Sequence, residues 1–431
     1  MSTQTQNLRG PSSIVGTVRE RLDKTQIGGR PPSYYLSGWR LGVFFLVLAL
    51  FFPLVTDQTL QVTAISVGVY VLLALGLNIV VGYAGLLDLG YVAFFVVGSY
   101  TVAVFTGGIL LRQDGSVAHI PTISFWLLLP LAAVLAGLFG VLLGAPTLRL
   151  RGDYLAIVTL GFGQILPIVF QNVPWFFGQL GMSALPPQDI GPISFSDTGN
   201  RSAFYYLTLL LVVLVILAVS SLRDSSLGRA WVAIREDETA AASSGVNLVR
   251  TKLLAFGLGA VTGGIGGALN ASFLGAIAPT DFNFGISITI LVMIVLGGLG
   301  SIPGVIIGAM LLRFFDVYLL GKINDTVHSS PLVTGDGSPL HFLATIDFNT
   351  AKYLFYGLIL MAMILLRPQG LIPNVRRQRE LAGIGAAPEG VSAIGLLEQE
   401  LAGEELTAID VGEQTEYVGE GSEALGREDH V

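Results

Sequence analysis

Long apolar segments alternate with shorter polar stretches along the chain, and this pattern predicts helices that cross a membrane. A helix needs about 20 mainly apolar residues to span the ~30 Å hydrocarbon core of a bilayer. Without a break at residues 296–301, LGGLGS, the chain would have nine spans. With it there are ten, some of them short, at residues 40–56, 60–81, 86–107, 123–145, 154–172, 204–222, 253–276, 285–299, 302–320 and 352–366. We therefore expect an all-α polytopic membrane protein with about ten transmembrane helices.

Composition supports this expectation, because 52% of the 431 residues are hydrophobic and only 12% are charged. Soluble domains carry roughly 25% charged residues. The chain has no cysteine, which excludes disulfides and thiolate metal sites, and its four histidines lack metal-ligand spacing. We therefore expect neither a metal site nor a cofactor.

The basic residues predict the orientation, because short cytoplasmic loops collect Lys and Arg. With ten spans and a cytoplasmic N-terminus, only Arg112, Arg201, Lys322 and Lys352 fall outside the cell. The cytoplasmic side receives the larger group, Arg149, Arg151, Arg223, Arg229, Arg235, Arg250, Lys252, Arg367, Arg376, Arg377 and Arg379. This asymmetry favours ten spans in a cell membrane, with both termini in the cytoplasm.

Three regions follow from these patterns. Residues 1–38 form a polar cytoplasmic segment, and the first apolar stretch begins too late and runs too long for a cleavable signal peptide. Residues 39–367 form the transmembrane domain. Residues 368–431 form a cytoplasmic tail, in which twelve acidic residues and one Arg follow position 388, so this part carries a charge of −11. Its Gly- and Glu-rich composition predicts disorder.

A polar island at residues 223–252 separates two of the spans. Asp237 can cap a short helix over residues 238–244, because its carboxylate can accept the free N–H groups of the first turn. Gly245 suits the left-handed position just past that helix. The helix carries three small side chains, Ala240, Ala241 and Ala242, over which a groove on another protein could close. We therefore predict a cytoplasmic docking element.

Glycines interrupt the apolar run near residue 85, in GYAGLLDLGYVAFF. Broken helices at membrane depth are tolerated where the backbone lines a cavity or is covered by protein. Asp88 in this stretch therefore either lines such a cavity or caps the third span. Elsewhere, four-residue glycine spacings such as Gly259, Gly263 and Gly267 predict close helix packing in preference to a substrate path. The chain has no G-x-x-x-x-G-K-[ST] motif, so any ATP must be bound by another chain.

Five stretches of the chain resemble the LivM-type permeases of ABC importers for branched-chain amino acids, in the family's order. They are GLNIVVGYAGLLDLGYVAFFVVGSYTVA (76–103), LRLRGDYLAIVTLGFGQI (148–165), LGRAWVAIREDETAAASSGVNLVRTKLLAFGLGA (227–260), ITILVMIVLGGLGSIPGVIIGAMLL (288–312) and LLRPQGLI (365–372). Two features depart from the family pattern. Gln164 stands where an acidic residue is expected after TLGFG, and the acidic tail exceeds what the family needs.

The resemblance implies a permease subunit that is not itself an enzyme. Its partners would be two ATP-binding cassette subunits, a second similar permease, an external solute-binding protein and the lipid bilayer, with no nucleic acid. Residues 223–252 would form the coupling loop, and its ATPase-coupling residues would be Glu238, Ala241 and Gly245, with Arg235 and Asp237. The substrate path would follow the interrupted helix, at Asn78, Gly82, Gly85 and Asp88.

Two other functions stay open from the sequence. Permeases of urea or other small-amide importers share this architecture. A self-contained secondary carrier would need paired charges at mid-membrane and an internal repeat, and neither is clear in the sequence.

Overall fold

The structure, a computed structural model, describes most of the predicted transmembrane domain. The residues described are 38–107, 109–111, 117–119, 122–147, 150, 152–182, 189–190, 193–194, 201–329, 348–367 and 369–372. The predicted N-terminal segment, apart from Gly38, and the acidic tail beyond residue 372 lie outside them. Their predicted cytoplasmic location and disorder therefore stay predictions.

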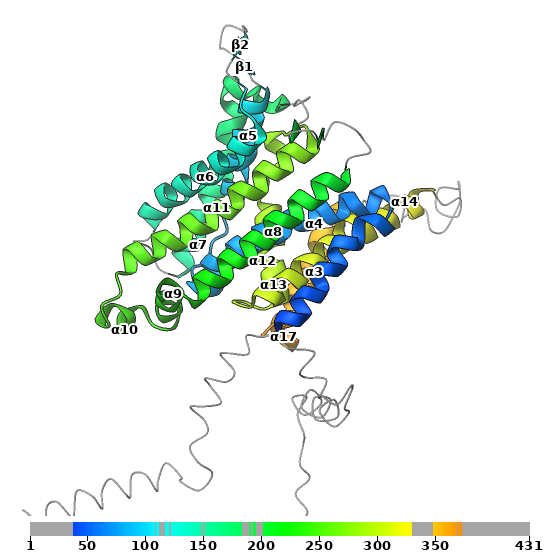
Figure 1. Ribbon diagram of the computed structural model, residues 1–431. Coiled ribbons are helices and arrows are strands. Elements are labelled where there is room, and N and C mark those ends of the chain that lie inside the picture. The colour runs from blue at the N-terminus through cyan, green and yellow to red at the C-terminus, as the bar shows by residue number, and fades with distance from the viewer. Residues whose placement is uncertain are drawn as a thin grey trace, which may run out of the picture. The chain divides into compact units, whose positions relative to one another are not determined.

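Helices make up most of the described chain (Figure 1). The α-helices are α3 (Gly38–Val55), α4 (Gln58–Leu77), α5 (Val92–Gly107), α6 (Phe125–Thr147), α7 (Asp153–Asn172), α8 (Arg201–Asp224), α9 (Ser226–Glu236), α10 (Glu238–Ser243), α11 (Leu248–Leu274), α12 (Phe284–Gly297), α13 (Ile302–Phe314), α14 (Gly321–Ser329) and α17 (Phe348–Leu366). Two π-helices, η1 (Asn78–Tyr83) and η5 (Phe315–Leu320), continue α4 and α13. Three 3₁₀ turns are η2 (Pro174–Phe176), η3 (Gly178–Leu180) and η4 (Pro279–Asp281).

Two short antiparallel ribbons interrupt this helical fold. One joins β1 (Ile109–Leu111) to β2 (Val117–His119), and the other joins β3 (Asp189–Ile190) to β4 (Ile193–Ser194). Both lie in connections between long helices, so the transmembrane architecture itself is helical, as the sequence predicts.

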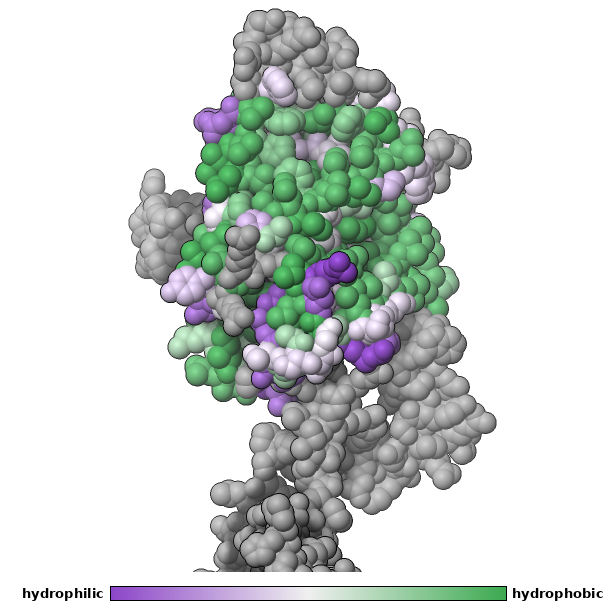
Figure 2. Space-filling view, turned by 90° about the vertical axis from the view of Figure 1, so that its left-hand side faces the viewer, coloured by the Kyte–Doolittle hydropathy of each residue, from purple (hydrophilic) through white to green (hydrophobic). Residues whose placement is uncertain are grey.

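Seven helical segments in the described part of the chain are long and apolar enough to cross a membrane. They are Gln58–Tyr83, Phe125–Thr147, Asp153–Asn172, Arg201–Asp224, Leu248–Leu274, Pro279–Gly297 and Ile302–Ser329. Three shorter apolar helices occupy Phe45–Val55, Val92–Thr106 and Lys352–Leu366. Hydrophobic residues cover much of the upper part of the face in Figure 2, while polar residues gather lower down. The structure is therefore that of a multi-pass helical membrane protein.

Helix α11 forms the centre of the packing and runs beside α6 (Figure 1). Its glycines allow neighbouring backbones to come close, as their spacing predicts. A Cβ on Gly267 would lie 2.8 Å from the backbone N of Ser99 on α5. The hydroxyl of Tyr91, just before α5, also donates a hydrogen bond to the carbonyl of Gly259 at 2.8 Å. Small residues of this kind let helices approach in lipid, where no hydrophobic effect drives them together.

The predicted break at residues 296–301 is a sharp turn between α12 and α13. Gly298 and Gly300 have φ angles of +121° and +80°, which side chains other than glycine rarely tolerate. The segment after α17 folds back onto this turn, where Leu371 N donates to Leu296 O at 2.9 Å. The turn and the last described residues therefore form one unit.

Replacing Gly98 with valine is expected to destabilise the bundle, because the new Cβ would lie 2.6 Å from the Cα of Gly264 on α11. Overpacking costs about 1–3 kcal/mol, so thermal unfolding in detergent should show a lower melting temperature. Gly161→Val is the matched control, because nothing lies within 4 Å of a Cβ at Gly161. Equal melting temperatures for the two variants would contradict the close contact between α5 and α11.

Candidate functional site

The polar island folds as two short helices joined at Asp237. As predicted, the Asp237 carboxylate caps α10, accepting hydrogen bonds from Thr239 N at 2.7 Å and Ala240 N at 3.0 Å. The bonds from Ala240 and then Thr239 lower the pKa of Asp237. The cap is therefore fully present above the ordinary aspartate pKa, and it is lost as the pH falls through the lowered value.

Helix α10 also stops as predicted, within one residue of the expected end. Gly245 has a φ angle of +85°. Its N–H donates to Ala242 O at 3.0 Å, and Val246 N donates to Ala241 O at 3.0 Å. This pair of bonds is a Schellman motif, which satisfies carbonyls left free at the helix end.

The three alanines of α10 differ in exposure. Ala240 and Ala242 are exposed, but Ala241 is only 3% exposed and faces its own protein. The expectation that all three present themselves to a partner is therefore wrong for Ala241. A helix turns 100° per residue, so one face of such a short helix has to pack on the bundle.

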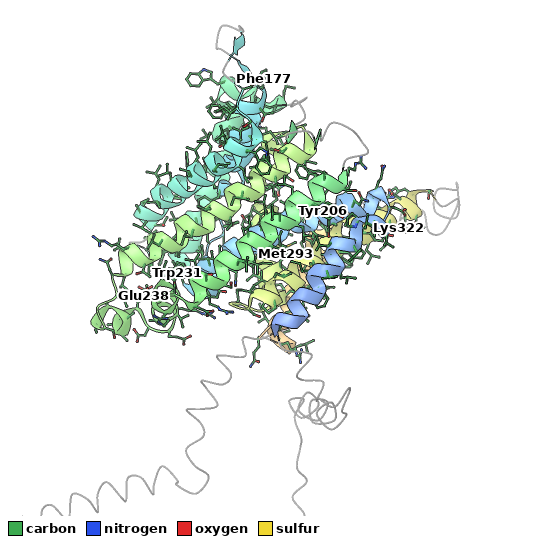
Figure 3. All side chains as sticks on the ribbon, viewed as in Figure 1. Phe177, Tyr206, Trp231, Glu238, Met293 and Lys322 are labelled. Carbon is green, nitrogen blue, oxygen red and sulfur yellow. The ribbon has the colours of Figure 1, made fainter. Side chains whose placement is uncertain are left out.

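Two side chains that the sequence did not single out hold the island on α11. Trp231 is fully buried and donates from Nε1 to Thr251 O at 2.8 Å. Lys252, whose side chain is 5% exposed, pairs with Glu238 at 2.5 Å. Trp231 and Glu238 lie near each other at this end of the protein in Figure 3. The three-residue spacing of Gly228, Trp231 and Ile234, all buried on α9, is the sequence signal that could have found the tryptophan.

Arg235 joins the two groups of residues that the sequence predicts for coupling and for the path. Its guanidinium donates from Nη1 to Gly82 O, in the π-helix η1. Its side chain also covers Gly85, where an added Cβ would lie 2.7 Å from Arg235 Cγ. Gly85 has a φ angle of +70°, so a side chain there would be strained as well. The polar island therefore rests directly on the interrupted helix.

The interruption begins at Asn78, where α4 passes into η1. Asn78 is fully buried, and its Oδ1 accepts a hydrogen bond from Gly300 N at 2.9 Å, in the α12–α13 turn. A Cβ on Gly82 would lie 2.8 Å from the same Gly300 N. π-Helical turns occur often at functional sites. Here the turn brings two breaks in the helical bundle into contact.

Asp88 lies in the non-helical segment before α5 and is 2% exposed. Its Oδ1 accepts from Gly90 N at 2.8 Å, whereas the first N–H of α5, at Val92, donates to Ser287 Oγ at 3.1 Å. Asp88 therefore orders the turn and does not cap the helix. Its Oδ2 is buried without a hydrogen-bond partner in the described part of the chain.

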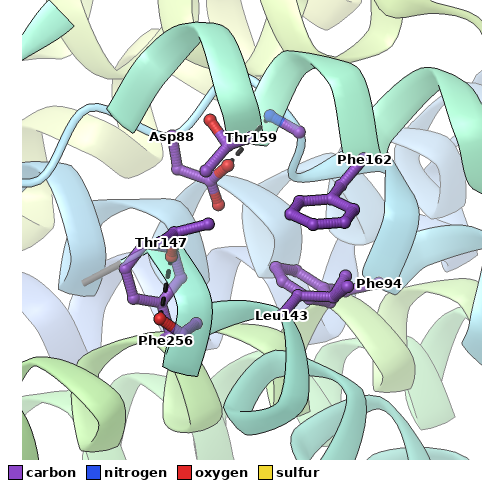
Figure 4. A pocket seen from close by; sticks show the side chains of 9 residues that line it. Asp88, Phe94, Leu143, Thr147, Thr159, Phe162 and Phe256 are labelled. Atoms are coloured by element: carbon purple, nitrogen blue, oxygen red, sulfur yellow. Dashed lines mark hydrogen bonds between the residues drawn. The ribbon is translucent and has the colours of Figure 1, made fainter. Parts of the chain in front are cut away.

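A small pocket adjoins Asp88 (Figure 4). Its other lining residues are mainly apolar and come from the segment before α5 and from α5, α6, α7 and α11: Gly90, Phe94, Leu143, Gly144, Thr147, Thr159, Phe162 and Phe256. The cavity has a volume of about 10 Å³, enough for on the order of one water molecule. An amino acid therefore does not fit in this conformation.

The predicted coupling and path residues thus meet through Arg235, Gly82 and Gly85, while Asp88 lines a separate pocket. In the described part of the chain, no group of three His, Cys, Asp or Glu could hold a metal ion.

The apolar helices and their glycine-mediated packing define a multi-pass membrane protein, and comparison with known proteins adds its family. A family model described as "Branched-chain amino acid transport system / permease component" matches residues 60–364. The chain therefore belongs to this family of transport permeases.

Several curated relatives agree. The high-affinity branched-chain amino acid transport system permease protein LivM of Escherichia coli K12 is 38% identical over 367 residues, covering 80% of this chain and 77% of the relative. A probable LivM of Methanocaldococcus jannaschii is 25% identical, covering 71% and 91%. LivH of Escherichia coli K12 is 26% identical, covering 61% and 87%. No solved structure gives a significant match.

Replacing Asp237 with alanine should speed hydrogen exchange at the amides of Thr239 and Ala240, because both lose their acceptor. Hydrogen–deuterium exchange of the α10 peptide, read by mass spectrometry, measures this change. Asp237→Asn is the control, since asparagine caps helices about as well as aspartate. Unchanged exchange in the alanine variant would mean that the cap does not stabilise α10.

Proposed function

We propose that this chain is the permease subunit of an ABC importer and forms the membrane path for branched-chain or other apolar amino acids. Its family and the names of its LivM and LivH relatives support this function. One structural observation carries the proposal: the exposed, capped helix α10 is joined through Arg235 of α9 to the interrupted helix. A connecting loop would not need this contact.

In this proposal the ATP is bound and hydrolysed by two separate ATP-binding cassette subunits. The other partners are a second, homologous permease and an external solute-binding protein. The chain crosses the membrane ten times, with both termini in the cytoplasm. The basic residues on the α9–α10 side and the apolar helices at all ten predicted segments support this topology.

The coupling step follows from how the island is held. An ATPase subunit docks on the exposed face of α10, formed by Ala240, Ala242 and neighbouring small polar residues. Glu238 and Gly245 act indirectly, since they fix α10 through the pair with Lys252 and the helix stop. Ala241 acts in the same way from its buried position. When the ATPase subunits close, α9 and α10 move together as a rigid body.

The substrate path is proposed to open where Arg235 now rests. Its guanidinium donates a hydrogen bond to Gly82 O, and its aliphatic stem covers Gly85. Movement of α9 would withdraw Arg235 and free backbone groups of the interrupted helix. Such groups can bind the ammonium or carboxylate of an amino acid. Asn78 would keep the break in place, and Asp88 would face the widened pocket.

Replacing Ala242 with tryptophan should block docking, because a large side chain on the exposed face of α10 would keep the ATPase groove from closing. Substrate-stimulated ATP hydrolysis by the assembled complex should fall by about tenfold, a change of the size usual for coupling between two sites. Ala242→Ser keeps the side chain small and serves as the control. Normal stimulation in the tryptophan variant would contradict docking on this face.

Replacing Arg235 with methionine should uncouple transport from ATP hydrolysis, because the interrupted helix loses its contact with α9. We expect about tenfold less substrate taken up per ATP hydrolysed in proteoliposomes. Arg229→Met is the control on the same helix, since Arg229 is exposed and donates to Asp224 O. If both variants keep the wild-type ratio, Arg235 does not transmit the movement.

A further inference from the structure

A second polar cluster lies within the apolar helices, where the sequence showed no clear pair of charges. Arg313 of α13 forms an ion pair with Asp316 of η5, and Lys352 of α17 lies 3.5 Å from Oδ1 of the same carboxylate. The three side chains are 19%, 7% and 26% exposed, respectively. Arg313 and Asp316 lie in the predicted span 302–320, and ionisable residues inside a membrane are costly and mark functional sites. Lys352 is the first residue of the last predicted span, at its outer end.

The cluster has two cations for one carboxylate, and only one of the cations is well satisfied. Arg313 pairs with Asp316, donates to Ser66 Oγ at 2.9 Å, and stacks 4.1 Å from the Tyr70 ring centre. Among the described residues, Lys352 has the 3.5 Å approach to Asp316, too long for a strong hydrogen bond, and a Tyr353 ring 5.6 Å away.

Helix α14, which packs on α17, carries one acid, Asp325, but the ion pair of Lys352 in the described part of the chain is with Asp316. The sequences of α4, α12, α13 and α17 contain neither Asp nor Glu, so Asp316 is their shared carboxylate. The Lys352 ammonium therefore shares the Asp316 carboxylate with Arg313, and the Lys352 side chain is a quarter exposed. A ligand that brings a carboxylate would give Lys352 a partner that it does not share with Arg313.

The position of the cluster suits the entrance of the transporter. Helix α14 follows η5 directly, and its Lys322 lies at the end of the protein remote from Glu238 (Figure 3). The cluster also coincides with the π-helix η5, where the regular winding of α13 is lost. As at η1, such a turn is frequent at functional sites.

We infer that Lys352 and Asp316 bind the charged end of a zwitterionic α-amino acid. The ligand carboxylate pairs with Lys352, and its ammonium pairs with Oδ1 of Asp316. Both charged groups of an α-amino acid sit on one carbon, which suits protein atoms only 3.5 Å apart. The inference rests on the proposed function, because it assigns that function's substrate class to a site opposite α10.

Aromatic rings beside the cluster provide an apolar surface for the ligand's side chain. Phe355 packs against Phe315 with ring centres 6.1 Å apart, and Tyr353 packs against Tyr356 at the same distance. Tyr353 and Phe355 remain 41% and 38% exposed. The combination of a charge pair with exposed rings favours an apolar amino acid over a sugar or a polyamine.

Binding of L-leucine, L-leucinamide and 4-methylpentanoate to the purified full-length chain tests the inference. The wild type should prefer leucine, because leucinamide lacks the carboxylate and 4-methylpentanoate lacks the ammonium. Lys352→Met should weaken leucine binding by about tenfold or more, as loss of one partner in a partly buried charge pair does. Lys352→Arg should retain it. Lys322→Met is the matched control, because the Lys322 ammonium interacts only with Tyr318 among the described residues.

Either of two results from the purified chain would overturn the inference. One is equal affinity of the wild type for leucine and leucinamide, which needs no variant. The other is a lower melting temperature of Lys352→Met with unchanged leucine affinity, which would make the cluster a structural clamp between α4, α13 and α17. ATP-driven leucine uptake by the assembled wild-type complex tests the proposed function separately. Uptake with an unchanged KM in Lys352→Met would leave that function standing and remove only this site.

Discussion

A break in a membrane helix frees backbone groups that lipid cannot satisfy, and the fold depends on meeting them from within. The chain breaks its helices at residues 78–91 and at 298–301. Arg235 supplies the donor for Gly82 O, and Asn78 supplies the acceptor for Gly300 N. A backbone group at each break thus forms its hydrogen bond with a side chain far away in the sequence. The irregular segments are therefore among the most tightly determined parts of the protein.

These hydrogen bonds between distant segments bring the irregular parts of the chain together in one group. The polar island contacts η1, η1 contacts the α12–α13 turn, and the turn pairs with residues 371 and 372. The glycines there serve close backbone approach, since a Cβ on Gly370 would lie 2.5 Å from Gly298 N. A continuous series of direct contacts therefore runs from α9 to the residues that follow α17.

Local rules predicted much of the structure. The cap at Asp237, the stop at Gly245 and the break after Gly297 each depend on residues within a few positions, and all are present. The contacts made by Arg235 and Asn78 could not be predicted, because they join residues 153 and 222 positions apart. Hydrophobic periodicity says nothing about which polar group meets which at such separations. The burial of Ala241 could not be predicted either, because it depends on how α10 packs on the rest of the protein.

The buried position of Ala241 separates two demands that act on a single helical turn. A change at Ala241 is opposed by the protein's own packing, whereas Ala240 and Ala242 carry no such restraint. Under the docking proposed above, the outer face of α10 can therefore diverge to suit a different ATPase while the fold stays intact. The residues that would select the partner, Ala240 and Ala242, are therefore neighbours of a residue that the fold requires, Ala241. The two kinds of position can change independently during evolution.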